Sequence, residues 1–168
     1  MDIPLDRLVV ELRSENIATR AVAAQSLCHE GEGARLAAEA LVLAAGDGAE
    51  DVREWAVSAL EDLGAPAAAD VAKLAALLTN EKADVRYWAA TLLGRLESEA
   101  ADATPQLVQA LSADTALAVR ERAALALGQI GAAAKLAVEP LKAAAAGAEP
   151  RLARLAATAL TQIEGAGK

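Results

Sequence analysis

The stretch AVRERAALAL at residues 118–127 decides the fold, because four other segments of the 168-residue chain repeat its pattern. The other copies occupy residues 51–60, 84–93, 151–160 and, more weakly, 18–27. All five copies close on a leucine, namely Leu27, Leu60, Leu93, Leu127 and Leu160, at spacings of 33, 33, 34 and 33 residues. Five copies at one period indicate an internal repeat, and this period is typical of stacked helical units.

Each copy carries the apolar spacing of an α-helix. In residues 51–60, Val52, Ala56 and Leu60 fall on one face of a helix with a period of about 3.6 residues. The composition agrees, because Ala and Leu dominate the 55% of residues that are hydrophobic, while only 2% of residues are aromatic. Ala and Leu favour helices, whereas strands favour β-branched and aromatic residues. The sequence therefore predicts an all-α fold.

Polar residues and glycines mark the expected ends of these helices. Asp51 and Asp84 stand where an N-cap side chain would accept the first free backbone N–H groups. Gly64 and Gly131 follow the last apolar residue of their copies, where glycine can take the positive φ that ends many helices.

A further helix is expected before each copy, so we predict ten helices in five antiparallel pairs. The earlier helices are predicted at residues 4–13, 33–45, 66–79, 104–112 and 134–146. Pro66 and Pro105 suit the first turn of a helix, whereas Pro140 should kink the last of these helices or move its start. We expect one domain over residues 1–164 and a flexible tail at 165–168, with repeats at 4–30, 33–64, 66–97, 104–131 and 134–164.

The residues of the repeat resemble the short bacterial HEAT-like repeats of phycobilisome-lyase relatives. That pattern has Val-Arg, then Ala three residues after the Arg, then Ala-Leu-Gly, and residues 119–131 reproduce it fully. The end copies depart from it, since Thr19 replaces the Val and Ala153 replaces the Arg. End repeats are often atypical because they lack a neighbour on one side. The resemblance implies a right-handed α-solenoid of about five two-helix repeats, also called an α-α superhelix.

The arginine of the repeat is expected to hold neighbouring repeats together. In a HEAT-like stack this side chain typically bonds an aspartate or the backbone of the adjacent repeat, forming a ladder. Asp114 is near enough in sequence to take part. We predict a structural ladder from Arg20, Arg53, Arg86 and Arg120 with Asp51 and Asp84.

A candidate binding surface follows from the same register. Trp55 and Trp88 lie two residues after the arginine, and Arg122 takes this position in the next copy. Such residues lie at the edge of the surface formed by successive second helices, which in HEAT stacks is generally concave. Trp, Tyr and Arg are common binding hot spots, although both tryptophans could instead fill space between repeats. The candidate partner-binding residues are Trp55, Tyr87, Trp88, Arg122, Glu54, Glu121 and Arg95.

The sequence offers little from which to build a catalytic or metal site. HEAT-like hydroxylases bind two irons with several His-Glu pairs, but this chain has one histidine, His29. Its one cysteine, Cys28, is adjacent, and neighbouring residues on a helix point about 100° apart. Phosphate-binding loops and nucleophile elbows are missing as well. We therefore expect no enzymatic activity, no metal and no cofactor.

The net charge of −8 excludes a broadly basic face, because binding nucleic acid requires clustered Lys and Arg. No apolar run approaches the roughly 20 residues that span a bilayer. Residues 1–6 show no sign of a signal peptide, and a single cysteine fits a reducing compartment, so we expect a cytoplasmic protein.

These observations predict a non-catalytic scaffold that binds a protein or peptide, with no nucleic-acid or membrane partner. An accessory subunit of a bilin lyase or isomerase is the alternative that the phycobilisome-lyase resemblance suggests. A HEAT-like DNA-repair glycosylase would need a basic concave face, which the net charge of −8 disfavours. The oligomeric state, and whether the chain is part of a longer protein, stay open.

Overall fold

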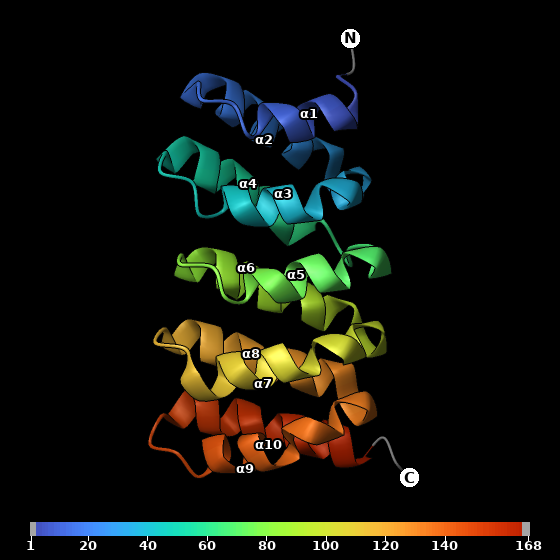
Figure 1. Cartoon of the computed structure of the whole chain (residues 1–168), viewed down its shortest axis with the longest axis vertical. Coiled ribbons are helices and arrows are strands. Elements are labelled where there is room, and N and C mark those ends of the chain that lie inside the picture. Colours follow the sequence, from blue (N-terminus) through green and yellow to red (C-terminus); the bar gives the residue numbers. More distant parts are fainter. Residues whose placement is uncertain (1–2, 166–168) are drawn as a thin grey trace. The chain divides into compact units, whose positions relative to one another are not determined.

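The computed structural model describes residues 3–165, and every regular element within that range is helical, as Figure 1 shows. The prediction of an all-α fold built from helix pairs is confirmed. Close contacts divide the chain into two compact units, Met1–Asp70 and Val71–Lys168, which are described separately below.

The first unit holds two helix pairs. Helices α1 and α3 lie in one layer, and α2 and α4 pack against each other in a second layer (Figure 1). Its elements are α1 (Leu5–Glu11), α2 (Ile17–Glu30), α3 (Ala38–Ala44), α4 (Glu50–Asp62) and short 3-10 helices at Gly31–Ala37 and Ala68–Asp70. The core forms between the layers and contains the fully buried Leu8, Leu27, Leu41, Leu60 and Leu63.

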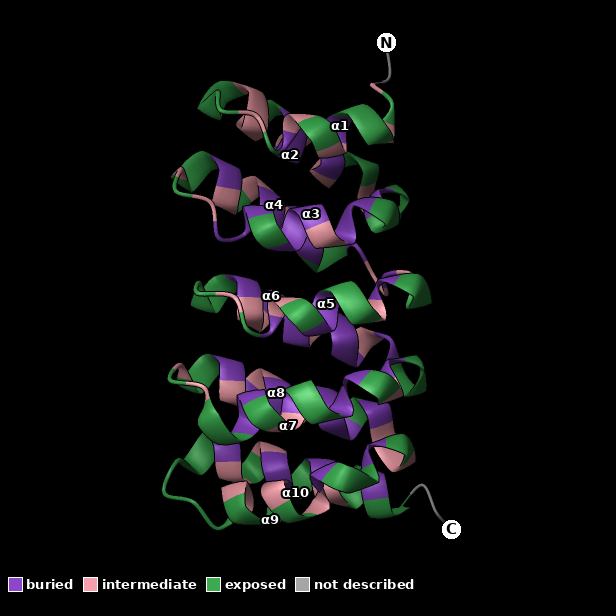
Figure 2. Ribbon diagram, in the orientation of Figure 1, coloured by how far each residue is buried: buried purple, intermediate pink, exposed green. Residues whose placement is uncertain are grey.

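The second unit holds three helix pairs, with α8 at its centre in contact with α6, α7 and α10. Its elements are α5 (Val71–Leu77), α6 (Ala83–Arg95), α7 (Thr104–Ala113), α8 (Leu117–Ile130), α9 (Val138–Ala145), α10 (Pro150–Gly165) and 3-10 helices at Glu97–Ala103 and Gly131–Ala137. Figure 2 shows the buried residues on the sides where helices face one another. The larger fully buried side chains include Leu74, Leu92, Leu93, Leu107, Leu111, Leu127 and Leu141.

The predicted second helices are confirmed, whereas the first helices α3, α5 and α9 begin later than predicted and α7 begins at Thr104, as predicted. Seven-residue 3-10 segments precede α3, α7 and α9, at residues 31–37, 97–103 and 131–137. None of these segments contains a proline, and α3, which has no proline itself, also begins after such a segment. The late start of α9 therefore does not require Pro140, which lies in the first turn of that helix. Helix α5 begins at Val71, after Pro66, whereas Pro105 occupies the first turn of α7 as predicted.

The predictions for the helix ends had mixed outcomes. Gly64 and Gly131 take positive φ values of 72° and 68°, as predicted. The prediction that Asp51 and Asp84 are N-caps is wrong, because α4 and α6 are preceded by the N-cap residues Ala49 and Lys82. Gly165, in the predicted tail, is the last residue of α10, and residues 166–168 of that tail lie outside the described range.

The glycine of the Ala-Leu-Gly motif lets second helices approach closely. A Cβ atom on Gly128 of α8 would lie 2.9 Å from the Cα atom of Ala159 on α10. A Cβ atom on Gly94 of α6 would lie 3.1 Å from the Cα atom of Ala126 on α8. Only the absence of a side chain permits these approaches, so Gly94 and Gly128 set the spacing between the second helices α6, α8 and α10 of the second unit.

Candidate binding surface on the second helices

The repeat arginines hold the loops that precede the second helices. Arg86 Nη1 donates to the carbonyl oxygens of Asn80 and Glu81, at 2.9 and 3.1 Å. Arg20 and Arg53 make the same pair of bonds to carbonyls five and six residues before them. Each arginine therefore closes its own loop against the first turn of the helix that carries it.

Two of these arginines also bind an aspartate of the next repeat. Nε and Nη2 of Arg20 donate to the two carboxylate oxygens of Asp47, at 2.8 and 2.9 Å. The same nitrogens of Arg86 donate to Asp114, at 2.6 and 2.8 Å, and both side chains of that pair are largely buried. Bidentate pairs of this kind are the strongest charge-assisted hydrogen bonds in proteins. They support the structural role predicted for the arginine ladder.

Burial and hydrogen bonding shift the pKa values of both members of the Arg86–Asp114 pair. Burial by itself would raise the pKa of Asp114. The hydrogen bond from Arg86 and the backbone N–H of Ala116, together with the charges of Arg86 and Arg120, outweigh this effect and hold the pKa of Asp114 below its ordinary value. The hydrogen bond to Asp114 likewise raises the pKa of Arg86.

The prediction was wrong about which aspartates take part. Asp51 and Asp84 lie exposed in the first turns of α4 and α6, and neither forms an ion pair within residues 3–165. They lie outside the ladder, whose carboxylates come from the loops before the helices, at Asp47 and Asp114. Arg120 departs from the pattern as well, since its Nε donates to the carbonyl oxygen of Leu111, at 3.1 Å.

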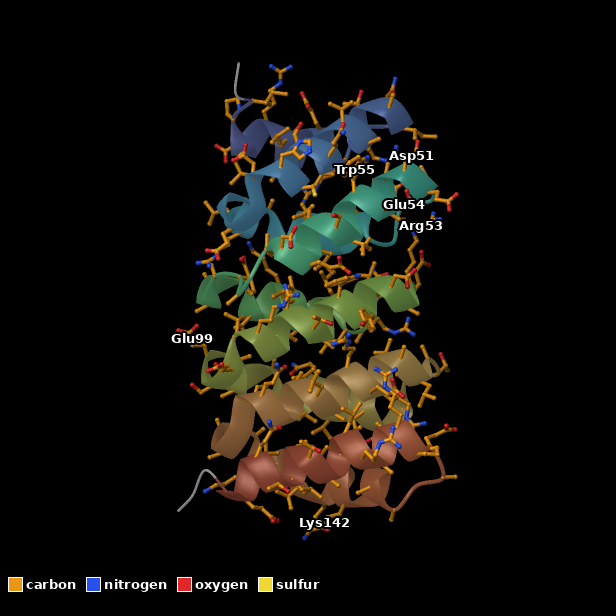
Figure 3. All side chains as sticks on the ribbon, turned by 180° about the vertical axis from the view of Figure 1, so that it is seen from behind. Asp51, Arg53, Glu54, Trp55, Glu99 and Lys142 are labelled. Atoms are coloured by element: carbon orange, nitrogen blue, oxygen red, sulfur yellow. The ribbon has the colours of Figure 1, made fainter. Side chains whose placement is uncertain are left out.

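The two tryptophans differ in exposure although they share a repeat position. Trp88 is only 8% exposed and meets the ring of Tyr87 edge-on, with ring centroids 5.6 Å apart. Trp55, on α4, is half-buried and meets the ring of His29 edge-on at 6.1 Å. Figure 3 shows Trp55 beside the exposed Glu54 on the same helix. Trp88 therefore contributes mainly to packing, whereas Trp55 leaves part of its ring accessible.

Tyr87 and Arg122 form the centre of the candidate surface in the second unit. The guanidinium carbon of Arg122 lies 4.6 Å from the centroid of the Tyr87 ring, in a cation–π arrangement, and its Nη2 donates to the Tyr87 hydroxyl. Glu121 is 8% exposed, and one of its oxygens lies 3.3 Å from Nη1 of Arg151 on α10. Arg95 is half-buried in the last turn of α6, apart from this cluster.

A cavity of about 220 Å³ opens beside this cluster, between α6, α8 and α10. Its lining combines an aromatic ring, two arginines and two leucines: the residues are Tyr87, Ala118, Glu121, Arg122, Leu125, Arg151 and Leu155. Four of these residues, Ala118, Leu125, Arg151 and Leu155, were not among the predicted binding residues. The repeat register was the signal that could have found part of this set, because Leu155 occupies the repeat position of Trp88 and Arg122. Ala118 and Arg151 likewise share one repeat position, two residues before that of the arginine.

A family model for HEAT repeats matches residues 71–161 of the chain. The chain belongs to the HEAT repeat family. A second model, described as the PBS lyase HEAT-like repeat, matches residues 52–71. The resemblance inferred from the Val-Arg and Ala-Leu-Gly motifs is therefore confirmed.

Solved structures similar to this HEAT repeat chain are natural and engineered. The complex of CpcE and CpcF of phycocyanin lyase from Nostoc sp. PCC7120 is 25% identical, with a TM-score of 0.65 over 98% of this chain and 66% of that one. An engineered protein is also 25% identical, with a TM-score of 0.64 over 95% of this chain and 78% of that one. A designed armadillo repeat protein in complex with the peptide (KR)4, 19% identical, shares the fold, with a TM-score of 0.64 over 98% of this chain and 88% of that one. No curated protein sequence matches the chain significantly.

The other reactive side chains of this HEAT repeat chain, the adjacent Cys28 and His29, make separate contacts. The Cys28 thiol donates to the Ser58 hydroxyl at 3.3 Å, and His29 is exposed. Among the described residues, no group of three or more His, Cys, Asp and Glu side chains is placed to hold a metal ion. None of the helices in residues 3–165 is long and apolar enough to cross a membrane.

Proposed function

We propose that this HEAT repeat protein is a non-catalytic scaffold that binds a protein or peptide on the surface of its second helices. The observation that supports this most is the cavity beside Tyr87 and Arg122, which joins an aromatic ring and a cation to the half-buried Leu125 and Leu155. Tyr and Arg are enriched among residues that dominate binding energy, particularly when they line a pocket.

The size of the cavity favours a macromolecular partner over a small ligand. Pockets for drug-sized ligands and cofactors usually measure about 300–1,000 Å³. A cavity of about 220 Å³ instead suits one side chain of a partner, inserted against Leu125 and Leu155. The rest of the partner segment would then lie across α8 and α10.

The charges around the cavity favour acidic groups beside the inserted side chain. Arg122 and Arg151 line the cavity together with one carboxylate, Glu121, which Arg151 already approaches. The side chain of Arg151 is 70% exposed, so its guanidinium can also meet a partner. A local basic surface on a chain of net charge −8 selects among partners by charge complementarity.

A selection from a random peptide library on the whole chain tests this proposal. Peptides that bind are then measured by fluorescence anisotropy against wild type, Tyr87→Ala and Leu155→Glu. We expect each variant to weaken binding at least about tenfold, because each removes a contact in the cavity. Circular dichroism must show that both variants stay folded.

Lys142→Ala is the matched control, because Lys142 is an exposed residue of α9 (Figure 3) that forms an ion pair with its helix neighbour Glu139 and does not line the cavity. Binding to this variant should equal binding to wild type. Selected peptides that bind Tyr87→Ala and Leu155→Glu as tightly as wild type would refute the proposed surface.

A second candidate function is an accessory subunit of a bilin lyase. It is favoured by the match to the PBS lyase HEAT-like repeat and by the similarity to the phycocyanin lyase complex. The chain spans 66% of the length of that structural neighbour. Mixing the protein with a linear tetrapyrrole and recording its absorption spectrum tests this function, and an unchanged spectrum would count against it.

A further inference from the structure

Of the two repeat arginines in the second unit, Arg86 and Arg120, only Arg120 has no carboxylate at the expected ladder position of the sequence. In the two complete pairs the aspartate lies two residues before the N-cap of the next second helix, where Asp47 precedes Ala49 and Asp114 precedes Ala116. Gly147 occupies the corresponding place before α10, whose first residue is Pro150. The loop that faces the fourth repeat's arginine therefore has no side chain at the ladder position.

The contacts of Arg120 reflect this missing partner. Its Nε donates to the carbonyl oxygen of Leu111, and within residues 3–165 neither Nη1 nor Nη2 has a hydrogen-bond acceptor. Asp114, the nearest ladder carboxylate, is already held by Arg86 through both oxygens and by the N–H of Ala116. The outer edge of the Arg120 guanidinium is thus available to an acceptor from elsewhere.

Two equivalent grooves in the second unit show the effect of having Gly147 where the preceding repeat has Asp114. The groove between α5 and α7 and the groove between α7 and α9 each have a volume of about 210 Å³. The first is lined by Asp114, which covers Arg86, and Arg86 is not part of its wall. In the second, Arg120 itself forms part of the wall.

We propose that the groove between α7 and α9 binds a carboxylate group from outside the chain, held by the Nη atoms of Arg120. A carboxylate is the group that Arg20 and Arg86 bind at the equivalent repeat position, in both cases through two hydrogen bonds from Nε and Nη2. In Arg120 the Nε donates to Leu111, so Nη1 and Nη2 are the two donors left for a carboxylate. Bidentate pairing gives arginine a geometric preference for carboxylates.

The other walls of the groove limit the ligand to a small group with an apolar stem. Leu111, Pro140 and Leu152 supply apolar contacts, and the Ser112 hydroxyl is a further donor. A volume of about 210 Å³ accommodates a short carboxylic acid or one acidic side chain. Glu149 also lines the groove but makes no ion pair with Arg120, and its exposed position leaves its charge screened by solvent.

Titration followed by NMR of the arginine Nε–H signals tests this site. The probes are sodium acetate and the blocked peptide Ac-AAEAA-NH2, with Ac-AAQAA-NH2 as the neutral control and ionic strength held constant. The Arg120 signal is assigned by its loss in Arg120→Gln. We expect a saturable shift with a carboxylate probe and none with the neutral peptide. A response to acetate alone identifies a small acid as the source, and tighter binding of the acidic peptide identifies an acidic side chain.

Gly147→Asp is the decisive variant, because it supplies the missing ladder carboxylate from within the chain. Its Cβ atom would lie 3.1 Å from the carbonyl oxygen of Ala144, a close approach that needs only a small shift of the loop. We expect carboxylate probes to bind Gly147→Asp at least about tenfold more weakly than wild type. Equal binding to wild type and Gly147→Asp, or no saturable shift with either carboxylate probe, would overturn the proposal. Arg120→Gln gives the same comparison if Gly147→Asp does not fold, read from the amide signals of Leu111 and Ser112.

Discussion

Replacing Asp114 by Asn tests the structural role of the arginine ladder. The substitution keeps the shape of the side chain but removes its charge and turns one acceptor into an NH2 donor. Because Arg86 Nε and Nη2 donate to both carboxylate oxygens, at 2.6 and 2.8 Å, one of these bonds must be lost. The guanidinium, whose side chain is only 12% exposed, then keeps its charge without a neutralising partner.

The magnitude follows from these contacts. A hydrogen bond to a charged group contributes about 1.5–3 kcal/mol, and removing one member of a buried ion pair costs about 3–5 kcal/mol. Arg86 also donates to the carbonyl oxygens of Asn80 and Glu81, so it is not left without acceptors. We therefore expect Asp114→Asn to lower the free energy of unfolding by about 2–4 kcal/mol at pH 7.

The effect should depend on pH, because the pKa of Asp114 is lowered in the folded state. A carboxylate with a lowered pKa stabilises the fold above its unfolded pKa, and this stabilisation is lost as the pH falls through the folded pKa. The stability difference between wild type and Asp114→Asn should thus be constant above about pH 5 and shrink below about pH 4. A difference that stays unchanged down to pH 3 would contradict the lowered pKa.

Urea denaturation followed by circular dichroism measures both effects. Asp84→Asn is the matched control, because Asp84 is exposed and outside the ladder, and its substitution should change stability by no more than about 0.5 kcal/mol. If Asp114→Asn costs no more than Asp84→Asn at pH 7, the ladder does not stabilise the fold and the reasoning is refuted.

Two further pairs of substitutions test the packing of the helices. Gly128→Ala should destabilise the protein by about 1–3 kcal/mol, and by more than Gly94→Ala does. The reason is that the added Cβ atom would lie 2.9 Å from the facing backbone at residue 128, against 3.1 Å at residue 94. Equal melting temperatures for the two variants would contradict this prediction. Trp88→Ala should lower the free energy of unfolding, measured by urea denaturation, by about 3–5 kcal/mol. Trp55→Ala should lower it by less, because Trp55 is only half-buried. The reverse order would contradict the roles assigned to the two tryptophans.

The repeat register predicted the second helices well because their apolar residues carry a strong helical period. The windows chosen from the closing leucines all fall within α2, α4, α6, α8 and α10. The 3-10 segments were missed for a physical reason. In an alanine-rich stretch such as residues 131–137, both the 3-10 and the α-helical period place an alanine on nearly every face, so the pattern does not distinguish them.

The ladder aspartates were harder to identify, because two candidates precede Arg53 within six residues. Asp51 is nearer in sequence, but it lies on the exposed side of the first turn of α4. Asp47 lies in the loop that faces the preceding repeat, where Arg20 reaches it across 27 positions of sequence. A signal was present nonetheless, since Ser, Asp, Asn and Asp occupy the place six residues before successive repeat arginines, at Ser14, Asp47, Asn80 and Asp114.

Departures from the repeat locate both proposed sites. Regular positions such as the closing leucines Leu27, Leu60, Leu93 and Leu127 are buried against the neighbouring helices, so they expose little surface to a partner. Where one copy differs from the others, a side chain lacks the contact that the neighbouring repeat usually supplies. Arg122 replaces the tryptophan found at this position in two earlier copies, and it contacts Tyr87 at the cavity between the second helices. Gly147 replaces the ladder aspartate and leaves Arg120 in the wall of a groove. In a repeat protein the consensus positions therefore explain stability, and binding is best sought where one repeat lacks what its neighbours supply.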